Sequence, residues 1–142
     1  MIYFDASYLV PMVRREVLSD RLIAFVASVA RERLVTSFWT LVECRSGLAR
    51  EVRMNRMPLA RFESCCRHLD DLITEGFDLV LPLEDDYRRA SNLVERPDSG
   101  LRAGDAVHLA VAERLGARLV LSLDNKMISI GRSRGIPAGM GF

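Results

Sequence analysis

The chain has 142 residues, of which 49% are hydrophobic, and this length predicts one compact domain over residues 1–142. Its 20 basic and 19 acidic residues leave a net charge of +1, so no global field of either sign indicates nucleic acid or a membrane as the partner. Residues 22–30, the most apolar stretch, are far fewer than the roughly 20 of a membrane-spanning helix, and the N-terminus has no secretory pattern, so we expect a cytoplasmic protein.

Four short apolar runs predict buried strands, at residues 2–4, 34–36, 77–81 and 119–121. Helical spacing of apolar residues predicts helices over about 18–29 and 59–73, the second with Pro58 in its first turn. A loop at 98–100 precedes a third predicted helix, from about residue 101 to 115, which Gly116 closes. Short strands alternating with amphipathic helices predict an α/β fold with a mostly parallel central sheet and helices on both faces.

The arginines are unevenly distributed along the chain. Between residues 45 and 67 six arginines oppose two glutamates, whereas residues 70–86 hold acids and no base. This basic segment favours either contacts with RNA phosphates or the solvated face of a helical hairpin. Under the first interpretation, Arg45, Arg50 and Arg53 are the candidate RNA-binding residues.

Two acidic residues stand where predicted strands end. Asp5 follows the first strand directly, and Asp124 follows the strand at 119–121 after two residues. In open α/β sheets, ligands bind beyond the carboxyl ends of the strands, at the point where the strand order reverses. Asp5 and Asp124 are therefore candidates for one shared site.

Two further acids interrupt apolar stretches that we expect to be helical. Glu43 ends the run Phe38-Trp39-Thr40-Leu41-Val42, and Asp105 stands within Ala103-Gly104-Asp105-Ala106-Val107. A buried carboxylate without a partner is costly, so each of these acids should have a partner or a function.

Carboxylates gathered within a few ångströms repel one another and raise their pKa values unless a cation neutralises them. The cluster Asp5, Glu43, Asp105 and Asp124 therefore predicts a metal site. Oxygen donors favour Mg²⁺ or Mn²⁺, whereas the three cysteines lack the spacing of a zinc site and are expected to be reduced thiols. Such ions activate water and neutralise charge in phosphodiester hydrolysis.

These motifs resemble, in order and spacing, the PIN-domain ribonucleases of the VapC toxin type. The resemblance rests on Phe4-Asp5-Ala6-Ser7, on Glu43 within Trp39-Thr40-Leu41-Val42-Glu43, on residues 101–110 and on Leu121-Ser122-Leu123-Asp124, and it spans essentially the whole chain. It implies a three-layer fold with a sheet of four to five strands, and cleavage of RNA by a Mg²⁺- or Mn²⁺-dependent endoribonuclease. It also implies a homodimer and a cognate VapB-type antitoxin whose C-terminal segment lies over the active-site groove.

Carried over position by position, the resemblance makes Asp5, Glu43 and Asp105 the main acid set, with Asp124 completing the site through metal or water. The small hydroxyl residues Ser7 and Ser122 match positions that support the acids, although threonine is common where Ser122 stands.

Several ordinary explanations stand beside these assignments. Asp5 and Asp124 would each serve as a helix cap, Glu43 as a surface residue and Asp105 as an acid in the favourable first turns of a helix. His108 is either a packed histidine or a general base near Asp105.

Two other functions compete with the nuclease. A haloacid-dehalogenase-like phosphatase needs a second aspartate two residues after the first, where this chain has Ser7. A catalytically inactive PIN-like module that binds RNA or a partner is the remaining alternative, and the presence of all four acids argues against it.

Overall fold

The computed structural model describes all residues from Met1 to Phe142 and contains a five-stranded sheet. Neighbouring strands all pair in parallel, in the order β3-β2-β1-β4-β5. This arrangement confirms the predicted α/β fold with its parallel sheet, and the four predicted strands are present. The fifth strand has only two residues and carries no pattern that would predict it. The strands are β1 (Ile2–Phe4), β2 (Leu34–Ser37), β3 (Asp78–Val80), β4 (Leu119–Leu121) and β5 (Ala138–Gly139).

Helices connect the strands, and three of them correspond to the helices predicted at 18–29, 59–73 and 101–115. A short 3-10 helix, Pro97–Ser99, precedes α6. No helix has the length and apolar character needed to cross a bilayer. The helices are α1 (Ala6–Arg14), α2 (Ser19–Ser28), α3 (Phe38–Arg53), α4 (Leu59–Gly76), α5 (Glu84–Val94), α6 (Ala103–Arg114) and α7 (Asn125–Ser133).

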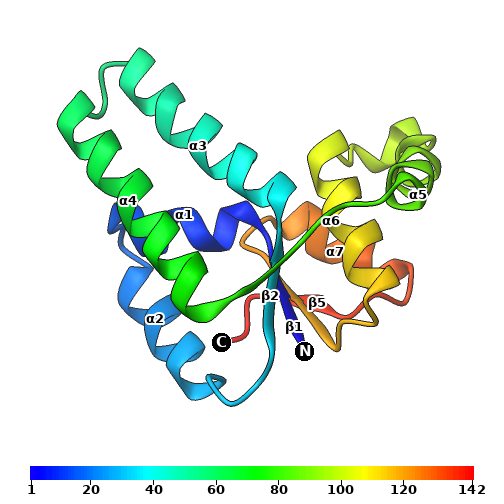
Figure 1. Cartoon of the computed structure of the whole chain (residues 1–142). Helices are drawn as coiled ribbons and strands as arrows, with labels where there is room; N and C mark the ends of the chain where they lie inside the picture. The colour runs from blue at the N-terminus through cyan, green and yellow to red at the C-terminus, as the bar shows by residue number, and fades with distance from the viewer.

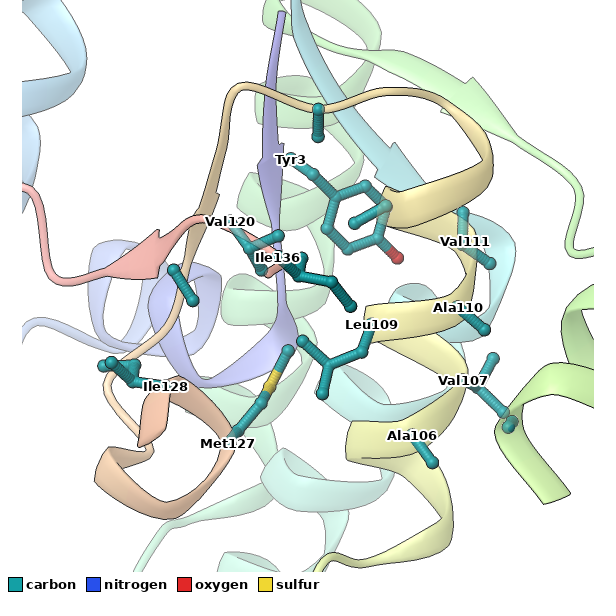
Figure 2. Close-up of a cluster of buried hydrophobic side chains, with 14 of the residues drawn as sticks. Tyr3, Ala106, Val107, Leu109, Ala110, Val111, Val120, Met127, Ile128 and Ile136 are labelled. Carbon is teal, nitrogen blue, oxygen red and sulfur yellow. The ribbon is translucent and has the colours of Figure 1, made fainter. Parts of the chain in front are cut away.

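The sheet forms the middle layer because its buried side chains alternate between two faces. Ile2 and Phe4 point to the face covered by α1 to α4, and Tyr3 points to the face covered by α5 to α7 (Figure 1). Figure 2 shows the second of these cores, in which Tyr3 and Val120 lie between the sheet and α6. The predicted three-layer arrangement is therefore confirmed.

A buried ion pair fixes α6 against α5. Asp86 is fully buried and accepts two hydrogen bonds from Arg114 Nε, at 2.8 and 3.0 Å, and one from the backbone N–H of Leu83 at 2.8 Å. A buried carboxylate that lost this partner would destabilise the fold by about 3–5 kcal/mol. The pair matters for the site because α6 carries Asp105 and His108.

The order of the strands creates a crevice at one edge of the sheet. From β1 the chain moves to β2 and β3 on one side, and later to β4 and β5 on the other. The strand order thus reverses between β1 and β4, and the residues after these strands lie at the position where parallel α/β sheets bind their ligands.

Candidate active site

Asp5 lies at the carboxyl end of β1 and is the N-cap residue of α1. Its side chain is only 3% exposed, and its Oδ1 accepts a hydrogen bond from the backbone N–H of Tyr8 at 3.0 Å. Burial raises the pKa of this carboxyl, and His108 and the hydrogen bonds to Asp5 act against the increase. The Asp5 side chain therefore both caps α1 and is a candidate metal ligand.

Two serines hold Asp5 in place. Ser7 Oγ donates to Asp5 at 2.8 Å, and Ser122 Oγ donates to Oδ2 at 2.8 Å. The same hydroxyls accept from the backbone N–H groups of Leu123 and Asp124, at 2.8 and 2.9 Å. They join the turn after β1 to the turn after β4, in the supporting role that the resemblance implies.

Asp124 and Asp105 stand at the starts of two helices. Asp124 caps α7, where its Oδ1 accepts from the backbone N–H groups of Lys126 and Met127 at 2.8 and 3.1 Å. Asp105 is the third residue of α6, and its Oδ2 accepts from the N–H of Arg102 at 3.4 Å. Burial, and then the charge of Asp124, raises the pKa of Asp105. The two carboxylates therefore repel each other across the site.

Glu43 reaches the site from α3. Its Oε2 lies 2.5 Å from His108 Nε2, and its side chain is 29% exposed. Glu43 is thus neither a fully solvated surface residue nor a buried acid without a partner.

All four acids line one small cavity of about 170 Å³. Ala6, Ser7, Arg102 and His108 complete its walls. The cavity has room for a hydrated cation or a phosphate group. A larger and more apolar cavity, of about 670 Å³, lies elsewhere, between α1, α2 and α4.

The donor set fits a hard divalent cation in chemistry and in charge. The acids offer oxygen ligands, and burial raises the pKa values of Asp5 and Asp105, with the charge of Asp124 adding to the increase at Asp105. No group of three or more His, Cys, Asp or Glu residues is already arranged around a common point for an ion.

The basic residues near the cavity differ from those that the sequence indicated. Arg45 pairs with Asp70 on α4, and Arg50 and Arg53 lie in the last turns of α3. Arg102 lines the cavity itself, and its only sign in the sequence was its place three residues before Asp105. Lys126, the only lysine, has its side chain beside Gly100. A Cβ atom added at Gly100 would lie 2.7 Å from the Nζ atom of Lys126.

The PIN domain model matches residues 2–133. No curated protein sequence matches the chain. Among solved structures, the chain is similar to VapC20 from Mycobacterium tuberculosis, a sarcin-ricin loop cleaving toxin, with 14% identity and a TM-score of 0.74 over 92% of this chain and 95% of that one.

Two further structures give the same fold. FitAcB from Neisseria gonorrhoeae has 17% identity and a TM-score of 0.73, covering 97% of this chain and 96% of that one. VapBC2 from Rickettsia felis, bound to a DNA fragment of its promoter, has 14% identity and a TM-score of 0.70, with 98% of each chain covered. Because the domain model spans nearly the whole sequence, the chain belongs to the PIN domain family, as the order of its acids predicted.

Proposed function

We propose that the protein is a Mg²⁺- or Mn²⁺-dependent endoribonuclease and the toxin of a VapBC-type toxin–antitoxin pair. The observation that carries this proposal is the convergence of Asp5, Glu43, Asp105 and Asp124 on one cavity at the strand ends of a PIN domain. The likeness to a sarcin-ricin loop cleaving toxin supports RNA as the substrate.

The four acids would hold the cation, with Ser7 and Ser122 fixing the orientation of Asp5. A bound divalent ion would lower the pKa of a water molecule and neutralise charge on the phosphodiester. The cavity admits a phosphate, and the RNA strand would lie across its mouth. Arg102 would contact a phosphate there, and its guanidinium takes part in none of the protein's ion pairs.

Cleavage should require the metal. Purified protein is expected to cut a single-stranded or hairpin RNA when Mn²⁺ or Mg²⁺ is present and to leave it intact with excess EDTA, because the repelling acids need a cation to bind the phosphodiester. Gel analysis of end-labelled RNA measures this, and a DNA strand of the same sequence is the comparison. Cleavage unaffected by EDTA, or no cleavage with either metal, would contradict the proposal.

The same assay distinguishes the candidate RNA contacts. Arg102→Ala is expected to raise KM several-fold, because one charge-assisted contact contributes about 1.5–3 kcal/mol before solvent exposure weakens it. Arg50→Ala, which removes the same charge from the far part of α3, is the matched control. A larger KM change for Arg50→Ala would instead place the RNA along the basic segment of α3.

A VapB-type antitoxin is the proposed partner, which the likeness to VapBC structures supports. The large cavity between α1, α2 and α4 offers it a largely apolar wall with Arg14, Arg15 and Arg61 at the edge. We assign this cavity to an antitoxin helix that presents apolar residues beside acidic ones.

Ile23→Glu places a carboxylate on the apolar wall of that cavity. It is expected to weaken antitoxin binding more than about tenfold, because the new carboxylate replaces apolar contact area and repels the acidic residues of the antitoxin helix, while RNA cleavage continues. Calorimetric titration with the antitoxin purified from the native pair measures the Kd. Ala24→Glu, at an exposed position on the same helix, is the control, and an unchanged Kd for Ile23→Glu would exclude this cavity.

The homodimer implied by the resemblance stays a prediction. Neighbouring strands β2 and β3 lead into exposed apolar side chains that a second copy would cover. They are Phe38, Val42, Leu81, Leu83 and Tyr87.

A further inference from the structure

A row of buried polar side chains leads from the sheet to the cavity. Tyr3 on β1 is fully buried, and His108 on α6 is 1% exposed. The Tyr3 hydroxyl lies 2.9 Å from His108 Nδ1, and His108 Nε2 lies 2.5 Å from Glu43 Oε2. Figure 2 shows the Tyr3 ring beside α6 with its hydroxyl facing that helix. The row thus begins in the middle layer of the fold and ends on a candidate ligand.

Both ring nitrogens of His108 are used in this row. Because a carboxylate only accepts hydrogen bonds, Nε2 carries the proton that lies between His108 and Glu43. The Tyr3 hydroxyl lies at the other nitrogen and donates its single proton to Nδ1, while the Ser37 hydroxyl, 3.0 Å from the Tyr3 oxygen, is able to donate to that oxygen. Contacts at both ring nitrogens therefore fix the orientation of the imidazole toward Glu43.

Glu43 has one oxygen held and one available. His108 contacts Oε2, and Oε1 makes no hydrogen bond to the protein. Instead Oε1 lies against Gly104, where a Cβ atom would be only 2.1 Å away. The contact with His108 thus leaves one oxygen of Glu43, a residue that lines the cavity, without a hydrogen-bond partner.

We propose that His108 and Tyr3 are positioning residues that hold the Glu43 carboxylate for a divalent cation. The proposal rests on the proposed function, in which Glu43 belongs to the cation site, and it gives the buried histidine a role that packing alone does not supply. A packed histidine would find its hydrogen bonds within the core, whereas His108 extends from the core to the wall of the cavity.

Mn²⁺ binding without RNA tests the proposal. His108→Leu, which has no donor for Glu43, is expected to weaken Mn²⁺ affinity about 10–100-fold, the usual range for partners of metal ligands. His108→Gln is expected to recover part of this loss, because its amide N–H can reach the position of Nε2–H. Tyr3→Phe keeps the imidazole but removes the hydroxyl that contacts His108 Nδ1. The loss of Mn²⁺ affinity in this variant should therefore be smaller than in His108→Leu. Calorimetric titration of the folded variants gives the Kd values.

Val107→Ala is the matched control, since it removes a buried side chain from the same helix without touching the row. It should lower the melting temperature and leave the Mn²⁺ Kd unchanged. If folded His108→Leu binds Mn²⁺ as tightly as the unaltered protein, or if His108→Gln recovers nothing, the positioning role is wrong. Failure of the proposed function appears differently, as an unaltered protein that binds Mn²⁺ and cuts no RNA.

Discussion

Asp5→Asn is expected to stabilise the metal-free protein while removing its response to metal and strongly lowering its nuclease activity. Burial raises the pKa of Asp5 above the value in the unfolded chain. The protonated form is therefore favoured by folding, and the stability that it contributes is lost as the pH rises through the folded-state pKa. At neutral pH the unfolded chain has released this proton, so the raised pKa of Asp5 in the folded protein opposes folding, and a neutral amide removes this effect.

The substitution leaves the local structure intact. Asparagine is as good a helix N-cap as aspartate, so its side-chain oxygen is able to accept from the Tyr8 N–H and α1 keeps its start. The hydroxyls of Ser7 and Ser122 are able to rotate to suit the amide. A loss of activity in this variant would therefore report on charge rather than on unfolding.

Thermal melts with EDTA and with Mn²⁺, at acidic and at neutral pH, measure the effect. At neutral pH the variant should melt a few degrees higher than the unaltered protein in EDTA, since each kcal/mol corresponds to about 2–4 °C. The gap should close at acidic pH, where Asp5 is protonated. Mn²⁺ should raise the melting temperature of the unaltered protein only, and cleavage by the variant should fall on the order of 10²–10³-fold.

Asp71→Asn is the control for the change in charge, because Asp71 is exposed on α4 and makes no hydrogen bond or ion pair with its side chain. It should leave both the metal response and the cleavage rate unchanged. If Asp5→Asn responds to Mn²⁺ as strongly as the unaltered protein does, Asp5 does not bind the ion.

The sequence predicted the elements whose apolar residues are regular. The continuous apolar run of β1 reflects burial on both faces of the sheet, and the helical spacing along α4 reflects burial on one side of that helix. α5 has a weaker pattern, because only Asp86 and Ala90 are buried on it and part of its attachment to α6 is the ion pair between Asp86 and Arg114. An ion pair between residues 28 positions apart has no local sign in the sequence.

The candidate site was predictable to a similar degree. The acids could be named because each stands at a strand end or within an apolar run, and the structure places them on one cavity. The contact between His108 and Glu43 spans 65 positions, and that between Tyr3 and His108 spans 105. Tyr3 looked like any other apolar strand residue, because its role depends on which face of the sheet α6 covers.

Gly104→Ala is expected to disable the site without unfolding the protein. Gly104 is the second residue of α6 and has no unusual backbone conformation to explain a glycine there. A Cβ atom at this position would lie 2.1 Å from Glu43 Oε1 and 3.1 Å from its Cδ. These distances are far below van der Waals contact, so the Glu43 side chain would have to leave, and its hydrogen bond to His108 would break.

The substitution should make α6 itself more stable, so its effect on stability can be separated from its effect on the site. Glycine in a helix is less favourable than alanine by about 1 kcal/mol in the interior, so the folding free energy should change little as the clash is relieved by the flexible end of Glu43. Cleavage and Mn²⁺ affinity should fall about 10–100-fold, as for the loss of a ligand's support. Steady-state kinetics, calorimetry and thermal melts on one preparation measure all three quantities.

Gly47→Ala on α3 is the matched control, because a Cβ atom there meets nothing within 4 Å. It should raise the free energy of unfolding by up to about 1 kcal/mol and leave cleavage unchanged. If Gly104→Ala cleaves RNA as fast as the Gly47→Ala protein, the carboxylate is not needed where His108 holds it. Gly104 therefore makes α6 less stable than an alanine would, but it leaves the space in which the Glu43 side chain stays at the wall of the cavity.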